Sequence, residues 1–424
     1  MLELKVIRAH KERVIEGLVK KNFKEVGLVD EIIEQDDNRK ALQQQLDDVL
    51  AKSNSASKQI GGLFKQGKRD EANAMKASIE GLKGEAKTLK EALETAKSAL
   101  HELLVQLPNI PHTSVPAGTS DEDNDIFQAW EGDLPNLGED AKPHWELAKT
   151  YGLFDLELGV KITGAGFPLY RGKGAKLERA LINFFLDEGE KAGYEEIVPP
   201  LLINAESAFG TGQLPDKEGQ MYYAEKDDLY LLPTAEIPIT NIYRDEIIEE
   251  KQLPIKLTGY TPCFRREAGS YGAHVRGLNR VHQFDKVEIV QITHPDKSYE
   301  TLHDMLNHVR GLLDKLGLPY RILTLCGGDV SFASALTYDF EVYSAAQKRW
   351  LEVSSVSNFE TFQSNRMKLR FRNEKRKTEL CHTLNGSALA LARIVAAIIE
   401  NYQTPEGIVI PEALRPYTRF DIIK

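Results

Sequence analysis

Cysteine is scarce in this sequence, and its placement excludes two classes of small, cross-linked fold. The three cysteines, Cys263, Cys326 and Cys381, are scattered without a C-x-x-C pair. A disulfide framework and a structural zinc site both require closer and more regular spacing. His274 and His282 lie near each other in the chain, but a polar or packing role is favoured for them over a metal role. We therefore expect no structural zinc.

Long hydrophobic runs are also missing. The longest apolar stretch, residues 388–399, is interrupted by Arg393 and is too short to span a bilayer. The first residues carry an acid at Glu3 and lead into mixed charge, so neither a signal peptide nor an arginine-rich transit peptide fits. We expect a cytoplasmic protein with no membrane partner.

A Walker loop is absent as well. The glycine-bearing segments 164–166 and 172–174 lack the G-x-x-x-x-G-K-[ST] spacing, and no strand pattern leads into them. Any ATP must therefore be bound in another way.

The sequence is long and unevenly charged. Its 424 residues are 42% hydrophobic and 28% charged, which suits a globular protein with two domains. The net charge of −10 is concentrated after residue 108, because residues 1–108 hold 19 basic and 18 acidic side chains. A net negative charge therefore does not exclude a nucleic-acid partner for the N-terminal part.

Two heptad seams predict a long antiparallel helical hairpin. Apolar residues recur at spacings of four and three from Met75 to Leu103, and a weaker seam with polar interruptions runs from Leu28 to Ile60. Segment 61–67 holds three glycines and loses the period, so we place the turn there. At about 1.5 Å per residue, arms of this length project on the order of 50 Å.

The tip of this hairpin is basic. No acidic residue occurs between positions 52 and 69, where the basic residues are Lys52, Lys58, Lys65, Lys68 and Arg69. Such a local field attracts polyanions, although a solvated hairpin end has the same composition. Contact with a nucleic acid and plain solvation both stay open on this segment alone.

Proline and acidic residues mark the end of the hairpin. Pro108, Pro111 and Pro116 stop the second helix, and the acidic stretch 120–125 follows. We expect domain 1–108, linker 109–125 and domain 126–424. In the last, helical patterns (176–192, 298–316, 386–402) mix with strand-like runs (229–232, 285–292, 338–342), which predicts an α+β fold whose antiparallel or mixed sheet is flanked by helices.

The most informative segment joins two strand-like pieces through a loop containing Gly269, Gly272 and Gly277. The first piece contains Arg265 and Glu267, and the second contains Phe284 and Glu288. If their inward faces coincide, these four side chains share one sheet surface, where they suit phosphate, a base amino group and a stacked purine. A structural salt-bridge network has the same composition.

This segment resembles motif 2 of the class II aminoacyl-tRNA synthetases, in the F-R-x-E and R-x-H-Q-F-x-K-x-E form of the seryl-tRNA synthetases. Residues 385–393 resemble motif 3, a strand-to-helix passage that places Arg393 beside the nucleotide. Residues 176–200 resemble motif 1, a helix and a proline-ended strand that imply a homodimer.

Two short elements and the hairpin narrow the resemblance to the seryl-tRNA synthetase family. Residues 234–236 match its T-x-E element and residues 352–355 match its E-x-S-S element. The N-terminal hairpin is similar to the tRNA-binding arm of the same family. The resemblance covers essentially the whole chain.

The resemblance implies a role for each matching position. Arg265 would bridge the α-phosphate and the serine carboxylate, Glu267 would read the adenine, and Phe284 and Arg393 would enclose it. Glu352 and Ser355 would hold Mg²⁺ on the phosphates. The implied serine site consists of Thr234, Ala235, Glu236, Arg265, Glu288, Asn385 and Ser387. The implied ATP site consists of Arg265, Arg266, Glu267, Val281, Phe284, Glu352, Val353, Ser354, Ser355 and Arg393. The implied catalytic residues are Arg265, Glu267 and Arg393.

The implied reaction needs no protein nucleophile. The carboxylate of L-serine attacks the α-phosphorus of ATP and pyrophosphate leaves, so the protein must neutralise charge and align the reactants. Serine then passes to the 3′ end of tRNA(Ser), and tRNA(Sec) stays open as a second acceptor. Buried groups that hydrogen-bond the serine hydroxyl would be left unpaired by alanine.

Three alternatives remain at this point. A class II synthetase for threonine or proline would share the motifs, and a catalytically silent RNA-binding paralogue would share the fold. A homologue that charges a carrier protein would be expected to lack the basic hairpin.

Overall fold

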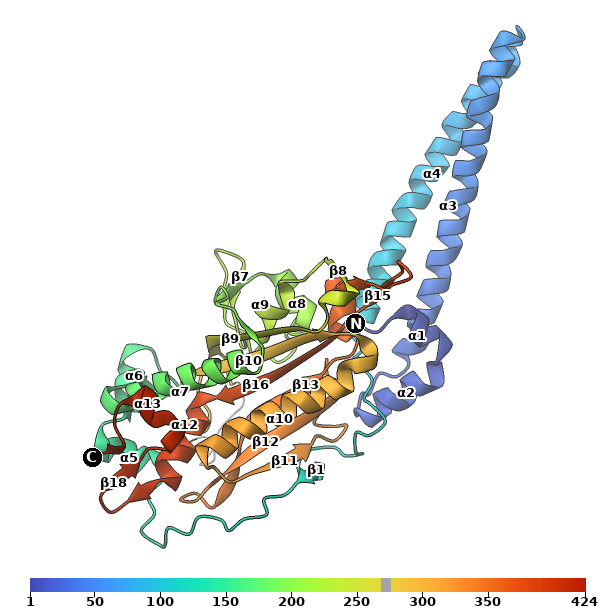
Figure 1. Cartoon of the computed structure of the whole chain (residues 1–424). Helices are drawn as coiled ribbons and strands as arrows, with labels where there is room; N and C mark the ends of the chain where they lie inside the picture. The colour runs from blue at the N-terminus through green and yellow to red at the C-terminus, as the bar shows by residue number, and fades with distance from the viewer. Residues whose placement is uncertain (268–275) are drawn as a thin grey trace. The chain divides into compact units, whose positions relative to one another are not determined.

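The computed structural model describes residues 1–267 and 276–424, which form two compact units (Figure 1). The first unit comprises Met1–Val19 and Phe23–Pro108, and the second comprises Lys20–Asn22 and Asn109–Lys424. Gly269, Gly272 and His274 of the motif 2 loop lie outside the described residues.

The first unit is dominated by two long paired helices. Helices α1 (Leu4–Ala9) and α2 (Lys11–Lys20) precede α3 (Leu28–Lys65) and α4 (Arg69–Leu104), and α3 and α4 lie side by side (Figure 1). Of the six buried side chains of α4, Ile79, Leu93, Ala96 and Leu100 fall on the predicted seam, while Ala72 and Leu104 lie just beyond its two ends. The predicted helical hairpin is confirmed.

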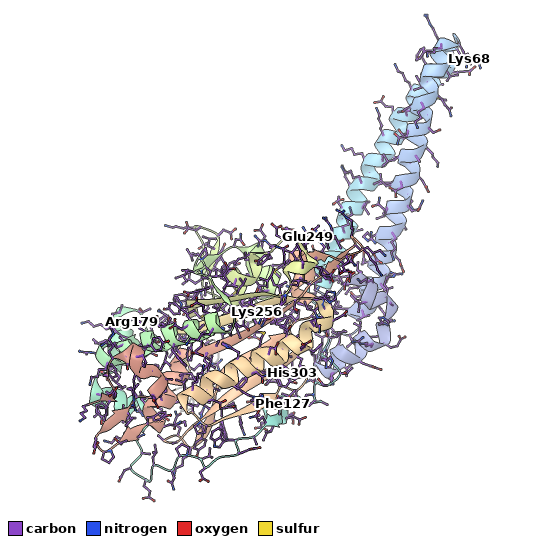
Figure 2. The ribbon with its side chains drawn as sticks, viewed as in Figure 1. Lys68, Phe127, Arg179, Glu249, Lys256 and His303 are labelled. Atoms are coloured by element: carbon purple, nitrogen blue, oxygen red, sulfur yellow. The ribbon has the colours of Figure 1, made fainter. Side chains whose placement is uncertain are left out.

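The predicted turn segment, residues 61–67, is correct only at its end. Gly61 and Gly62 continue α3, and the chain reverses only over residues 66–68, where Gly67 has φ +74°. Glycine weakens a helix by about 1 kcal/mol per residue, which a two-helix seam can offset. The five basic residues are exposed on the last turns of α3, at the turn and at the start of α4, as Lys68 illustrates (Figure 2).

A buried acidic residue, Asp36, explains why the apolar seam of α3 has polar interruptions. Asp36 is 1% exposed, and it accepts hydrogen bonds from Arg8 Nη1 at 2.9 Å and Arg39 Nη2 at 2.7 Å. Lys40 Nζ lies 2.8 Å from the same carboxylate. Burial opposes ionisation, but these cationic partners outweigh it and lower the pKa of Asp36. An ion-paired cluster thus replaces apolar packing at this level of the hairpin.

The second unit is built on a mixed sheet. Within residues 1–267 and 276–424 its eight strands run in the order β1-β11-β12-β13-β16-β10-β9-β4, antiparallel except for the β4–β9 pair. Their bounds are β1 (Asp125–Gln128), β4 (Glu195–Glu196), β9 (Ile255–Phe264), β10 (Gln283–Thr293), β11 (Tyr320–Thr324), β12 (Leu336–Ser344), β13 (Arg349–Asn358) and β16 (His382–Ala390). The predicted α+β class is confirmed.

Three long amphipathic helices cover one face of this sheet (Figure 1). Leucines and phenylalanines of α7 (Gly172–Lys191), α10 (Ser298–Leu316) and α12 (Leu391–Asn401) pack with inward strand residues such as Val287, Ile289 and Phe340 in one core. Because strand side chains alternate between faces, the neighbours of these residues point to the opposite face. That opposite face is free to carry a site.

The remaining elements frame this face. Short helices are α5 (His144–Tyr151), α6 (Leu156–Ile162), α8 (Ala205–Thr211), α9 (Glu236–Asn241), α11 (Phe362–Met367) and α13 (Arg415–Thr418). Small sheets are formed by β2 (Phe154–Asp155) with β3 (Leu169–Tyr170), by β5 (Leu202–Ile203), β7 (Leu229–Leu231) and β6 (Tyr223–Ala224), by β15 (Thr378–Leu380), β14 (Arg370–Arg372) and β8 (Ile247–Glu249), and by β17 (Gln403–Thr404), β18 (Gly407–Val409) and β19 (Ile422–Ile423).

One helix prediction was wrong in its first part. Residues 386–390 form the end of strand β16, and helix α12 begins only at Leu391. Apolar runs fit a buried strand and a buried helix equally well, so periodicity did not separate the two. No helix among the described residues is long and apolar enough to cross a membrane.

Candidate active site

A cavity of about 1010 Å³ opens on the sheet face opposite the three long helices. Strand β10 shows how the face is selected: Phe284, Lys286 and Glu288 line the cavity, whereas Val287 packs in the core. This alternation follows from the two-residue period of a strand. The cavity therefore receives every second residue of the motif 2 strand.

Adjacent strands add polar residues at matching positions. Ser387 on β16 is the cross-strand partner of Glu288, and Asn385 on β16 is the partner of Ser357 on β13. Paired residues point to the same side of a sheet, so all four line the cavity. The Oγ of Ser354 donates a hydrogen bond of 2.6 Å to the Ser387 carbonyl, which ties β13 to β16 behind this surface.

One end of the cavity is a buried polar pocket suited to a small amino acid. Thr234, between β7 and α9, donates its hydroxyl to Glu288 Oε2 at 3.1 Å, and Lys286 Nζ lies 2.6 Å from the same oxygen. Glu236 begins helix α9 and accepts a hydrogen bond of 2.7 Å from Gln363 Nε2 on α11. Carboxylates here can pair with an ammonium group, and the hydroxyl and amide groups can meet a polar side chain.

Burial changes the acidity of this pocket. Glu236 is 7% exposed, and burial followed by the nearby charge of Glu288 raises its pKa to about 7. Gln363, Lys286 and Asn385 act in the opposite direction. The charge of Glu288 therefore disfavours ionisation of Glu236 in the free pocket, and a bound cation would favour it.

The other end carries two arginines and an aromatic ring, a set that suits a nucleotide. The Arg265 guanidinium lies 5.3 Å from the centroid of the Phe284 ring, and Arg265 Nε donates to the Pro233 carbonyl at 3.3 Å. Arg393, in the first turn of α12, donates from Nε to the Asn279 carbonyl at 2.9 Å and from Nη1 to the Glu352 carbonyl at 2.6 Å. Both guanidinium groups line the cavity.

The strand pattern predicted Arg265 and Glu267 on the sheet surface, but neither residue lies on a strand. Strand β9 ends at Phe264, and both residues follow it in the loop, where the carboxylate of Glu267 pairs with Arg280. They still reach the cavity together with Phe284 and Glu288. The predicted common surface is thus correct for β10 and is completed by a loop.

A β-bulge brings Glu352 and Ser355 to the same side. Residues three apart on a regular strand face opposite ways, but the pairing register between β12 and β13 shifts at Val353. Glu352 then faces Glu341, and Ser355 faces Asp339, to which its hydroxyl donates a hydrogen bond. Burial and the charge of Glu352 raise the pKa of Asp339 well above its ordinary value. Acidic and hydroxyl oxygens therefore gather beside the nucleotide end.

Two of the residues assigned by resemblance do not line the cavity. Ala235 is fully buried behind Thr234, and Arg266 turns away to lie over the ring of Tyr222, with its Nε donating to the Met221 carbonyl. The other assigned serine-site and ATP-site residues all line it, including Val281, Val353 and Ser354. The assigned roles themselves stay predictions.

Two polar residues that line the cavity, Lys286 and Asp339, and one buried residue behind it, Gln363, received no role from the sequence. Lys286 contacts Glu288 and Thr234, Asp339 contacts Ser355, and Gln363 contacts Glu236. Only Lys286 carried a signal, because it lies two residues from Glu288 within the motif. Asp339 and Gln363 come from distant parts of the chain, and only folding brings them to the site.

Comparisons with known proteins agree along the whole chain. Residues 1–111 match the model of the seryl-tRNA synthetase N-terminal domain, and residues 221–402 match that of the class II tRNA synthetase core domain for G, H, P, S and T. The serine–tRNA ligase of Salinibacter ruber is 51% identical over 422 residues, which cover 99% of this chain and 98% of that protein. The chain belongs to the seryl-tRNA synthetase family.

Other members of the seryl-tRNA synthetase family show the same correspondence. The serine–tRNA ligase of Chlorobaculum parvum is 46% identical over 428 residues, with complete coverage of both chains. The seryl-tRNA synthetase of Pyrococcus horikoshii, solved with ATP, superposes with a TM-score of 0.93 at 32% identity and covers 100% of this chain and 99% of that one. Sequence and fold thus place the whole chain in the family.

Proposed function

We propose that this chain is an ATP-dependent serine–tRNA ligase. It activates L-serine with ATP to seryl-adenylate and pyrophosphate, and then transfers serine to the 3′ end of tRNA(Ser). The observation that carries this proposal is that one cavity is lined both by a buried charged cluster, Thr234, Glu236, Lys286 and Glu288, and by Arg265, Arg393 and the Phe284 ring. An amino acid and a nucleotide bound in these two places would meet near Arg265.

The side chains of this chain account for adenylation without a covalent enzyme intermediate. Arg265 lines the cavity beside Phe284 and would supply positive charge where the serine carboxylate meets the α-phosphate. Phe284 offers a stacking face to the adenine, and Arg393 supplies charge at the phosphates. As the new oxygen–phosphorus bond forms, the bond to pyrophosphate breaks, and the arginines compensate the charge that moves onto the leaving group.

The charged groups of the nucleotide end are already paired with one another. Glu267 pairs with Arg280, and Arg393 Nη1 lies 3.4 Å from Glu352 Oε2. At these two pairs a nucleotide would exchange partners and would not meet isolated charges. Glu267 would turn to the adenine amino group and Arg393 to phosphate oxygen.

The residues assigned to Mg²⁺ fit that ion. Glu352 and Ser355 offer a carboxylate and a hydroxyl, which are the hard oxygen ligands that Mg²⁺ prefers. Asp339 lies beside them, and burial and the charge of Glu352 raise the pKa of its carboxyl group. When bound, Mg²⁺ would neutralise phosphate charge; the arginines and Phe284 would orient the nucleotide.

The N-terminal hairpin and the motif 1 segment provide surfaces for the two proposed macromolecular partners, tRNA(Ser) and a second copy of this chain. Lys52, Lys58, Lys65, Lys68 and Arg69 form an exposed basic tip that suits a phosphate backbone, here that of tRNA(Ser). After β4, Val198 is 87% exposed and Leu201 and Leu202 are also exposed. An exposed apolar segment of this kind suits a self-complementary contact, which supports a homodimer.

A catalytically silent RNA-binding paralogue is the competing function. Such a protein would have lost the charged groups of the nucleotide end, but Arg265, Glu267 and Arg393 are all present around the cavity. The carrier-protein alternative is disfavoured by the basic hairpin. Catalysis of adenylation and transfer to tRNA is therefore preferred.

The test is a pair of assays on purified protein. Serine-dependent ATP–pyrophosphate exchange measures the first step, and charging of tRNA(Ser) and tRNA(Sec) transcripts measures the second. Glu288→Ala should abolish serine-dependent exchange, and removal of residues 27–105 should spare exchange but abolish charging. Binding of tRNA without exchange for any amino acid would favour the silent paralogue instead.

A further inference from the structure

Lys286 occupies an unusual position for a lysine. It lies on β10 in the middle of the polar pocket and is 6% exposed, whereas lysine is almost never fully buried unless it is paired. Its Nζ is 2.6 Å from Glu288 Oε2 and donates to Thr234 Oγ1 at 2.9 Å. The side chain thus bridges the two groups that define the pocket floor.

Every donor and acceptor position of the Thr234 hydroxyl is already used in a hydrogen bond. Its oxygen accepts from Lys286 Nζ and, at 3.2 Å, from the backbone N–H of Glu236. Its single proton is donated to Glu288 Oε2. A threonine hydroxyl has one proton and two lone pairs, so nothing on it is left for a ligand. Thr234 therefore orients its neighbours and does not read the substrate.

The same count leaves two groups free at the edge of the cavity. The ammonium of Lys286 has three N–H bonds, of which two are used. Glu288 Oε2 is shared by Lys286 and Thr234, and within the described residues no donor contacts Oε1. The pocket floor therefore presents one strong donor and one strong acceptor side by side.

We propose that Lys286 is a specificity-determining residue of the serine pocket, and this rests on the proposed function. It orients the Glu288 side chain with Oε1 free, and its third N–H donates to the serine hydroxyl while Glu288 Oε1 accepts from it. A hydroxyl can donate and accept at once, so serine satisfies both groups. Alanine satisfies neither and leaves a buried ion pair partly unsolvated.

Charge balance supports the same role. Without Lys286 the pocket would hold Glu236 and Glu288 with no permanent cation between them. The groups that face Glu236 are Glu288 and Lys286 from β10, Gln363 from α11 and Asn385 from β16. With Lys286 in place, ionised Glu236 and Glu288 leave one net negative charge, which the ammonium of serine neutralises. Lys286 thus matches the pocket to a zwitterion whose carboxylate is held by Arg265.

The test compares Lys286→Met, Lys286→Arg and a matched control, Lys256→Met, in serine- and alanine-dependent pyrophosphate exchange. Lys256 lies on the neighbouring strand β9, with its Nζ over the Tyr194 ring and outside the cavity (Figure 2). Lys286→Met should raise KM for serine about 10- to 100-fold and change KM for ATP less than about threefold. The kcat/KM for alanine should fall by a smaller factor than that for serine, because alanine shares the charge balance but has no hydroxyl to pair with Lys286. Lys286→Arg should recover part of the loss, and Lys256→Met should match the wild type.

A second variant separates misfolding from lost recognition. Lys286→Met alone leaves Glu288 buried without its cation, whereas Lys286→Met with Glu288→Gln removes both charges and should fold normally. The double variant should keep ATP binding but still discriminate serine from alanine at least about tenfold less than the wild type. The acid limb of the serine kcat/KM profile should also move to higher pH in Lys286→Met, because Glu236 loses a stabilising cation.

The outcomes separate this inference from the function on which it rests. An equal loss of serine and alanine activity in Lys286→Met would show a merely structural role, and unchanged serine KM would show no role in the pocket. A wild-type protein that gives no serine-dependent exchange would overturn the proposed function itself. Unaltered discrimination in the double variant would overturn the assignment of the hydroxyl to this pair.

Discussion

The buried acid Glu236 offers a test in which stability and activity should change in opposite directions. Its pKa lies at about 7 in the folded protein, against 4.5 for an ordinary glutamate, because burial and Glu288 disfavour its charge. Between these two values the folded state binds more protons than the unfolded state, so stability falls as pH rises through this range. Glu236→Gln removes that titration while preserving shape.

The size of the effect follows from the shift. A difference of one pKa unit corresponds to about 1.4 kcal/mol, so ionising Glu236 costs the ligand-free protein about 3 kcal/mol well above pH 7. At pH 5 most of that cost is absent. We expect Glu236→Gln to be stabilised relative to wild type by about 2 to 3 kcal/mol more at pH 8 than at pH 5. Serine binding should weaken because the pocket loses the carboxylate of Glu236, which contributes to the negative charge that the serine ammonium neutralises.

Tryptophan fluorescence during urea unfolding measures this difference in the right part of the molecule. Trp130, Trp145 and Trp350 are the three tryptophans of the chain, and all lie in the second unit. The first unit therefore does not contribute to the signal. An equal effect of the substitution at both pH values, or a variant less stable than wild type at pH 8, would refute the reasoning. Added serine should stabilise the wild type more than Glu236→Gln.

Three further variants test the hairpin and the cation site. Asp36→Ala should lower the free energy of unfolding of the first unit by about 1 to 3 kcal/mol, measured by helical circular dichroism. Because the pKa of Asp36 is lowered in the folded protein, the stabilisation that Asp36 provides should disappear as pH falls below about 4. A destabilisation by Asp36→Ala that persists at such low pH would contradict the ion-pair explanation. Glu352→Gln should raise the Mg²⁺ concentration for half-maximal exchange about tenfold with little change in KM for serine, and unchanged Mg²⁺ dependence would exclude Glu352 as a ligand. Lys65→Glu with Lys68→Glu should lower kcat/KM for tRNA charging at least about tenfold and weaken its salt dependence, while exchange stays constant; unchanged charging would remove the role assigned to the tip.

Much of the fold followed from local pattern. The heptad seams predicted α3 and α4, and the patterns at 298–316 and 338–342 correspond to α10 and β12. Errors occurred where local chemistry is ambiguous: glycines at 61 and 62 were tolerated inside a paired helix, and residues 386–390 formed a strand because β10 and β13 supply their partners. Hydrogen bonding to distant strands overrode the local preference there.

The sequence by itself determined the family, the helical hairpin with its basic tip, and the residue types that phosphate and adenine require. Tertiary structure alone decided how they combine. The bulge at Val353 turned Glu352 and Ser355 to one side, and the arrival of α11 placed Gln363 on Glu236. Above all, the contact of Lys286 with Glu288 and Thr234 depends on strand alternation and on a loop more than 50 residues away in the chain. Such contacts arise from burial of groups distant in sequence, and no local pattern contains that information.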